Sequence, residues 1–131
     1  MPMTRYLLRK MQDHELKTAT YTPPTHIYVA LFTATPSKSG GGTEVSGTGY
    51  ARQICDSWSA SSDADVTDAS NSALVDWGTA GGAWGVATHF GLFDALTAGN
   101  LLRYGALETP RTIESGDPVT APIGDLHMTL E

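Results

Sequence analysis

Apolar and polar residues alternate along much of this chain, and this is the spacing of β-strands rather than of helices. The clearest alternation lies between residues 84 and 107. A first strand ends near Phe93, residues 94–100 supply Asp, Thr, Gly and Asn for a turn, and residues 101–107 return as a second strand. Because both strands are apolar on both faces, we expect them in the middle of a sheet that is covered on each side.

Other segments on both sides of this hairpin also have strand character. Residues 28–34 and 89–95 are similar to each other, YVALFTA and HFGLFDA, so we expect two neighbouring central strands in one sheet. About seven short strands separated by Gly, Pro and Ser turns are typical of a mainly β protein, an antiparallel β-sandwich or jelly roll. Besides the hairpin, the predicted strands or extended segments are residues 27–32, 50–58, 73–77, 109–115 and 126–131.

Two segments lack an apolar pattern and are expected to be surface loops. Residues 34–49 are rich in glycine, but the residues that a phosphate-binding loop requires after its last glycine are missing. Residues 59–72 are polar and include Asp63, Asp65 and Asp68. An EF-hand that starts at Asp63 would need Gly and Glu where Asp68 and Leu74 stand, so that site is excluded, whereas a looser calcium site remains open.

One segment, residues 3–17, has helical spacing and predicts a short amphipathic N-terminal helix. The two prolines at residues 23–24 end the helical region. We therefore divide the chain into a helix and linker, residues 1–22, and a β-sandwich domain, residues 23–131. A helix this short is marginal alone, so its apolar stripe is expected to pack on its own sandwich or on a neighbouring subunit. The predicted partner-binding residues on it are Met3, Arg5, Leu7, Arg9, Lys10 and Met11.

The chain has 8 basic and 14 acidic residues and a net charge of −6, which disfavours binding to nucleic acid through its phosphates. Half of the basic residues lie in the first 17 positions. This cluster is either a solvated helix face or a surface that docks on an acidic partner. Since Arg5, Arg9 and Lys10 interrupt the N-terminal apolar segment and no run is long enough to span a bilayer, we expect neither a signal peptide nor a membrane partner.

The chain offers no recognisable catalytic, metal or cofactor site, and we expect it not to be an enzyme. His14 is followed by Glu15, but Thr18 occupies the position where a zinc protease needs its second histidine. Cys55 cannot form an internal disulfide and is expected to be a small core residue, because the neighbouring acidic side chain disfavours a reactive thiolate. His89 is expected to be a hydrogen-bonded residue of the core.

Eight segments together resemble a family of small tailed-phage virion proteins, which are described as tail-fibre or minor structural proteins and have relatives among head-decoration proteins. The sequence departs from the family pattern at Trp77 and Gly78, where an aromatic residue followed by proline is expected. The matching segments are YVALFT at residues 28–33, GTEVSG at 42–47, GYARQ at 49–53, NSA at 71–73, THFGLFD at 88–94, GNLL at 99–102, GAL at 105–107 and GD at 116–117.

The resemblance implies a non-enzymatic virion protein that is assembled in the host cytoplasm and contacts the major capsid protein or tail components. Heptads and short repeats of a fibre shaft are absent from the sequence, so we favour a head decoration (cement) protein on the capsid surface. A tail-fibre or tail-tip component is the alternative, including a host-binding adhesin. We also expect self-association, most simply as a homotrimer, because the apolar strands lack obvious polar edges. An adhesin would use as sugar platforms the aromatic residues Trp58, Trp77, Trp84 and Tyr104.

Overall fold

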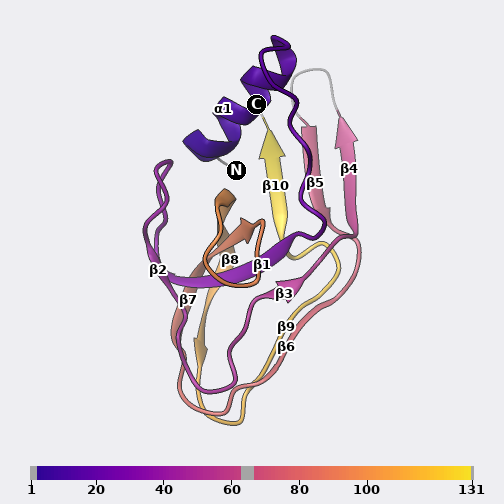
Figure 1. Ribbon diagram of the computed structural model, residues 1–131. Coiled ribbons are helices and arrows are strands. Elements are labelled where there is room, and N and C mark those ends of the chain that lie inside the picture. Colours follow the sequence, from indigo (N-terminus) through magenta and orange to yellow (C-terminus); the bar gives the residue numbers. More distant parts are fainter. Residues whose placement is uncertain (1–2, 63–66, 131) are drawn as a thin grey trace.

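A computed structural model describes residues 3–62 and 67–130, and it shows a mainly β chain with one N-terminal helix (Figure 1). Every strand pair is antiparallel, which confirms the predicted fold class. The described elements are α1 (Arg5–Glu15), β1 (Tyr28–Ala34), β2 (Thr43–Glu44), β3 (Gln53–Ile54), β4 (Trp58–Ser62), β5 (Thr67–Asn71), β6 (Val75–Thr79), β7 (Gly85–Phe93), β8 (Leu101–Ile113), β9 (Pro118–Ala121) and β10 (His127–Leu130).

The main sheet has the order β2-β1-β7-β8, and β3 also pairs with β1. The predicted hairpin is β7 and β8, and the prediction that the two similar segments are neighbours is confirmed, because Leu31 of β1 lies opposite Phe90 of β7. Of these two strands, β7 lies in the middle of the sheet whereas β8 lies at its edge, so the prediction for β8 was wrong. The apolar pattern of a strand indicates that its side chains are buried, but it does not show how many neighbouring strands it has. The start of β8 is covered by the N-terminal segment instead of another strand, and there Thr4 N donates to Leu102 O at 2.9 Å.

The main core lies between one face of this sheet and the pair of strands β6 and β9. The β1 residues Val29 and Leu31 face Trp77, Val119 and other buried residues there. The opposite face of the sheet carries a smaller apolar cluster, made of Ala30, Phe32, Phe93 and Leu101. Apolar residues on both faces of β1 and β7 therefore enter two separate clusters, which explains why these strands show near-continuous hydrophobicity.

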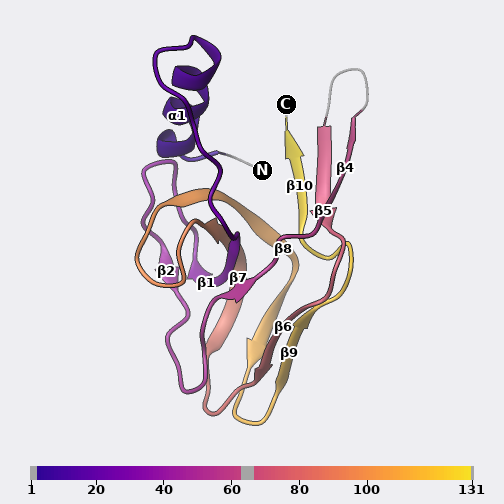
Figure 2. The same ribbon diagram turned by 45° about the vertical axis from the view of Figure 1, so that its right-hand side comes forward.

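Residues 59–72 are not the predicted loop, because β4 and β5 pair as antiparallel strands; residues 63–66 lie outside the described residues. β5 also pairs with β10, so β10 does not close the main sheet as expected. Serine-rich and aspartate-rich strands give no apolar alternation, and backbone pairing on both sides of β5 holds them in place. Figure 2 shows these three strands and α1 extending from the same end of the main sheet.

The predicted strand over residues 50–58 is also wrong, because β3 contains only two residues and β4 begins at Trp58. Arg52 and Cys55 are buried, whereas Ile54 is 52% exposed, so the expected alternation fails here. Residues 34–49 are more ordered than a free loop, since they contain β2 and place Val45 in the main core with its backbone N–H bonded to Leu31 O. The third predicted strand begins at Val75 as β6.

Candidate functional site

The N-terminal end of α1 is fixed to the main sheet. Thr4 is 2% exposed and caps the helix, because its hydroxyl accepts a hydrogen bond from Leu7 N and donates to main-chain carbonyls at the start of β8. Met3 forms an isolated antiparallel bridge with Arg103 of β8. Leu7 is the one residue of α1 that is fully buried. The first turn therefore has a fixed position, and it uses Leu7 of the predicted apolar stripe for this purpose.

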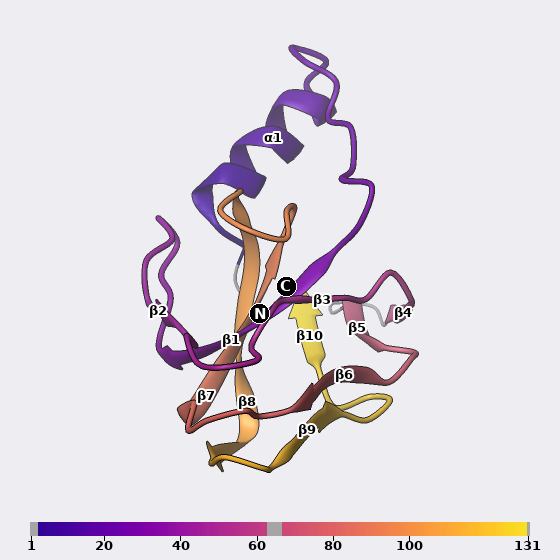
Figure 3. The ribbon, with the colours of Figure 1, turned by 60° about the horizontal axis from the view of Figure 1, so that its bottom comes forward.

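Beyond its first turn, α1 lies away from the sheets (Figure 3). Leu8 is 41% and Met11 42% exposed, and Leu16, which follows the helix, is 62% exposed. The other end is held by the linker, because Tyr21 N donates to His14 Nδ1 at 3.2 Å. The predicted apolar stripe is thus divided: Met3 and Leu7 anchor the helix, whereas Leu8 and Met11 are exposed.

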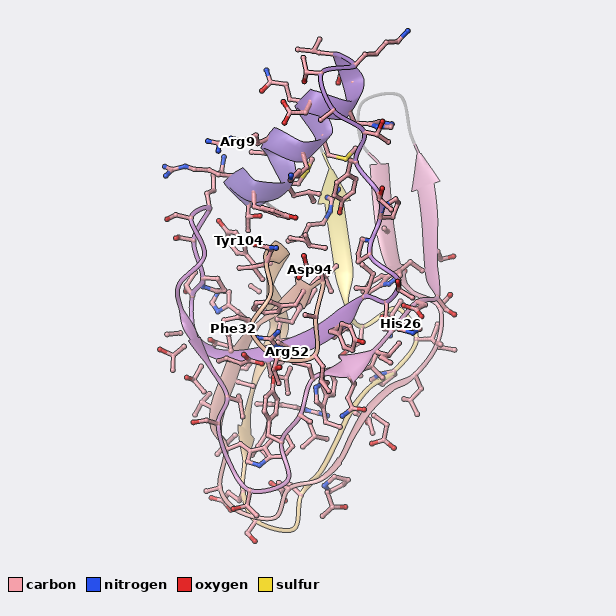
Figure 4. All side chains as sticks on the ribbon, viewed as in Figure 1. Arg9, His26, Phe32, Arg52, Asp94 and Tyr104 are labelled. Carbon is pink, nitrogen blue, oxygen red and sulfur yellow. The ribbon has the colours of Figure 1, made fainter. Side chains whose placement is uncertain are left out.

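The three predicted basic residues lie on this open helix. Arg5, Arg9 and Lys10 are exposed, and none forms a salt bridge in the part of the chain that the structure describes. Lys10 Nζ lies 5.7 Å from the centroid of the Tyr6 ring, and Arg9 points away from the sheets (Figure 4). Residues 1–17 hold four of the eight basic and two of the fourteen acidic residues, so the remaining chain holds four basic and twelve acidic residues.

A cleft of about 250 Å³ separates α1 from the hairpin turn between β7 and β8. Its lining includes Tyr6, Tyr21, Tyr28 and Asp94, so the space under the helix is aromatic and polar rather than aliphatic. Burial, together with the nearby Tyr6 hydroxyl and the Asp94 carboxylate, raises the pKa of Tyr21. Because this cleft is not filled by apolar side chains, the helix packs on the domain through its first turn only.

The hairpin turn itself is held by Arg52, which is 8% exposed and was not expected from the sequence to be a buried charge. Its guanidinium binds both carboxylate oxygens of Glu44, through Nε at 2.9 Å and Nη2 at 2.8 Å. Nη1 donates to the carbonyl oxygens of Ala95 and Ala98 at 2.9 and 2.8 Å. The guanidinium carbon also lies 3.5 Å from the ring centroid of Phe93, so the turn, the loop before β3 and β2 form one unit.

Tyr50 completes this arrangement. Its hydroxyl donates to Glu44 Oε2 at 2.8 Å and accepts from Leu31 N at 3.1 Å, and burial raises its pKa. Glu44, Tyr50 and Arg52 belong to two of the segments that resemble the phage family, GTEVSG and GYARQ. The resemblance of both segments to the phage family was the one sequence feature that pointed to these three residues. The spacing of the residues along the chain could not show that the two segments contact each other.

The remaining candidate residues serve the fold. Cys55 is buried in the core, as predicted, and burial raises the pKa of its thiol. His89 is hydrogen-bonded to two threonine hydroxyls, as predicted, but it is half-buried rather than a residue of the core. Trp77 and Trp84 are each 4% exposed, which leaves no open indole face there for a sugar.

Among the residues that the structure describes, no group of three or more His, Cys, Asp or Glu side chains is placed to hold a metal ion. Asp63 and Asp65 lie outside the described residues, so the calcium question stays a prediction. No helix within the same ranges is long and apolar enough to cross a membrane.

One family model matches the chain over residues 2–129, and its description is Podophage GP4 fiber I protein gp80. No curated protein matches the chain. The family match covers α1, the linker and almost all of the β domain, so it includes both the projecting helix and the cluster around Arg52.

Proposed function

Since the chain belongs to the family of podophage GP4 fiber I protein gp80, a family of phage structural proteins, we propose that it is a non-enzymatic subunit of the phage fibre. The family description favours the tail-fibre alternative over the head decoration role that the absence of fibre-shaft repeats had favoured. The domain would be one building block of an assembly, held to neighbouring virion proteins by surfaces outside its own core.

The observation that carries this proposal is the position of α1. The helix is fixed at Thr4 and Leu7, and its next turns place partly exposed apolar side chains beside exposed arginine and lysine. An amphipathic helix of 11 residues gains most of its stability from packing of its apolar side. Because α1 buries little of that side on its own domain, a neighbouring virion protein with an acidic surface supplies the missing contact.

The experiment is a triple charge reversal, Arg5→Glu, Arg9→Glu and Lys10→Glu, introduced into the phage. Fewer copies should remain on purified particles, and wild-type occupancy should fall as salt rises, because exposed charges are screened. The melting temperature of the isolated variant should change little, since these side chains are exposed. Glu114→Lys is the control, because Glu114 is an exposed charged residue in the turn between β8 and β9, at the end of β8 remote from the helix. Unchanged occupancy of the triple variant at every salt concentration would contradict attachment through α1.

We also propose that the assembled form is a homotrimer. β8 is 13 residues long, pairs on one side with β7 and is covered at its start by Met3 and Thr4. A long strand with an open edge is a feature that association covers. Light scattering on the isolated protein gives its mass directly. A monomer at tens of micromolar that does not change when tail protein is added would contradict this proposal.

A further inference from the structure

A second open surface lies on β6 and on the loop between β9 and β10. Leu74 is 57% and Ile123 69% exposed, which makes Ile123 the most exposed of the large apolar residues that the structure describes. Leu74 precedes β6 and alternates with the buried Val75, so it lies on the outward side together with exposed Asp76. We name this surface the β6 patch and define it as Leu74, Asp76, Ile123 and the exposed Asp125.

The β6 patch is held on a fixed backbone. Val75 pairs with Ala121, which brings the loop that carries Ile123 next to Leu74. Asn71 is fully buried and its side-chain amide donates to Pro122 O at 2.9 Å, while its Oδ1 accepts from the N–H of Leu126. Gly124 N donates to Asn71 O, also at 2.9 Å. These bonds fix both ends of the loop, so little conformational freedom is left to lose when a partner binds.

The composition of the β6 patch complements that of α1. The helix places Leu8 and Met11 beside three cations, and the β6 patch places two more exposed apolar residues beside two carboxylates. In Figures 1, 2 and 3 the β9–β10 loop lies apart from α1, whose first turn Thr4 fixes to the start of β8. A helix that is anchored in this way cannot reach the β6 patch of its own chain.

We propose that α1 of one copy docks on the β6 patch of a second copy. This inference rests on the proposed function, because it names the partner of the same helix. The contact joins two different surfaces, so it is heterologous and either closes into a ring or continues as a filament. Closure after three copies would give the proposed homotrimer. Apolar burial supplies the attraction, and the opposite charges orient the helix and make assembly sensitive to salt.

The test uses one variant for each surface. The helix variant carries Arg5→Glu, Arg9→Glu and Lys10→Glu, and the patch variant carries Ile123→Asn and Asp125→Asn, so that the altered helix meets no opposite charge on the altered patch. All five side chains are exposed, so both variants should fold, and unchanged thermal unfolding verifies this. In sedimentation at low salt, the wild type should self-associate and each variant alone should be monomeric. Glu114→Lys, a charge reversal of an exposed residue in the turn between β8 and β9 and outside both surfaces, should associate like the wild type.

Mixing the two variants distinguishes the proposed contact of α1 with the β6 patch from a contact in which both copies use the same surface. The patch variant keeps an intact helix and the helix variant keeps an intact patch, so the mixture should form a one-to-one dimer and stop there. A mixture that stays monomeric would overturn the inference, and so would a patch variant that still associates or a wild type that is monomeric. The proposed function survives those results if the helix variant is lost from particles while the patch variant is retained, because α1 would then bind a different virion protein.

Discussion

Replacing Arg52 with alanine should destabilise the whole domain although Arg52 lies outside α1 and the β6 patch. The substitution removes the two hydrogen bonds to Glu44 and the two to the hairpin turn, and it removes the stacking on Phe93. The Glu44 carboxylate would keep its hydrogen bond from Tyr50 but lose its only ion-pair partner among the described residues. The carbonyls of the turn would lose their donor.

The expected magnitude follows from burial. Breaking a buried ion pair by removing one partner costs about 3–5 kcal/mol, because the other charge is left without compensation. The Arg52 side chain is 8% exposed but that of Glu44 is 27% exposed, so water can reach part of the carboxylate and we expect the lower end, about 3 kcal/mol. For a domain of this size such a loss lowers the melting temperature by roughly 10 °C.

Urea unfolding followed by tryptophan fluorescence measures this loss, because Trp84 packs edge-to-face on Tyr50 with ring centroids 5.4 Å apart. Arg9→Ala is the matched control, since Arg9 is exposed, and its free energy of unfolding should stay within about 0.5 kcal/mol of the wild type. Glu44→Gln combined with Arg52→Ala should cost less than the sum of the single changes. If Arg52→Ala costs less than about 1 kcal/mol, the buried cluster does not hold the domain together.

Three other substitutions or probes test separate parts of the structure. Asp56→Asn should remove a pH-dependent part of the stability, because hydrogen bonds from a histidine and a backbone amide lower the pKa of Asp56. The ionised Asp56 carboxylate therefore stabilises the fold above about pH 4, and this stabilisation is lost as the pH falls through the lowered pKa. Urea midpoints of wild type and variant should converge in acid, and a constant difference would contradict this. The Cys55 thiol should react with a disulfide reagent far more slowly in the folded than in the unfolded protein, because burial raises its pKa; equal rates would show that it is accessible. Gly91→Ala should lower the free energy of unfolding by about 1–3 kcal/mol, because the new Cβ would lie 2.8 Å from two side chains. Gly82→Ala is the control, because the nearest atom to its new Cβ is 3.5 Å away. Equal urea midpoints for the two alanine variants would contradict the prediction.

The antiparallel β class, the β7–β8 hairpin and the extent of α1 were predictable from local signals, because alternation of apolar residues, turn residues and helical spacing act over a few neighbouring positions. The pairing of β1 with β7 was predicted instead from the similarity of residues 28–34 and 89–95. The core position of Cys55 was also predicted, although the strand expected around it did not form. The predictions from local signals hold because, in these segments, the local preference of the sequence agrees with the conformation that the folded protein requires.

Tertiary structure alone decided the features whose partner residues are distant in sequence and are not marked by an internal similarity. The polar β5 became a strand because β10 pairs with it from the far end of the chain. Arg52 could be buried because Glu44 and two turn carbonyls meet its guanidinium, an arrangement that no spacing of single residues reveals. The amphipathic pattern of α1 was readable, but which of its apolar residues stay open depends on where Thr4 anchors the helix. Local patterns report which surfaces a segment can bury, whereas the burial itself depends on contacts that form only when the whole chain has folded.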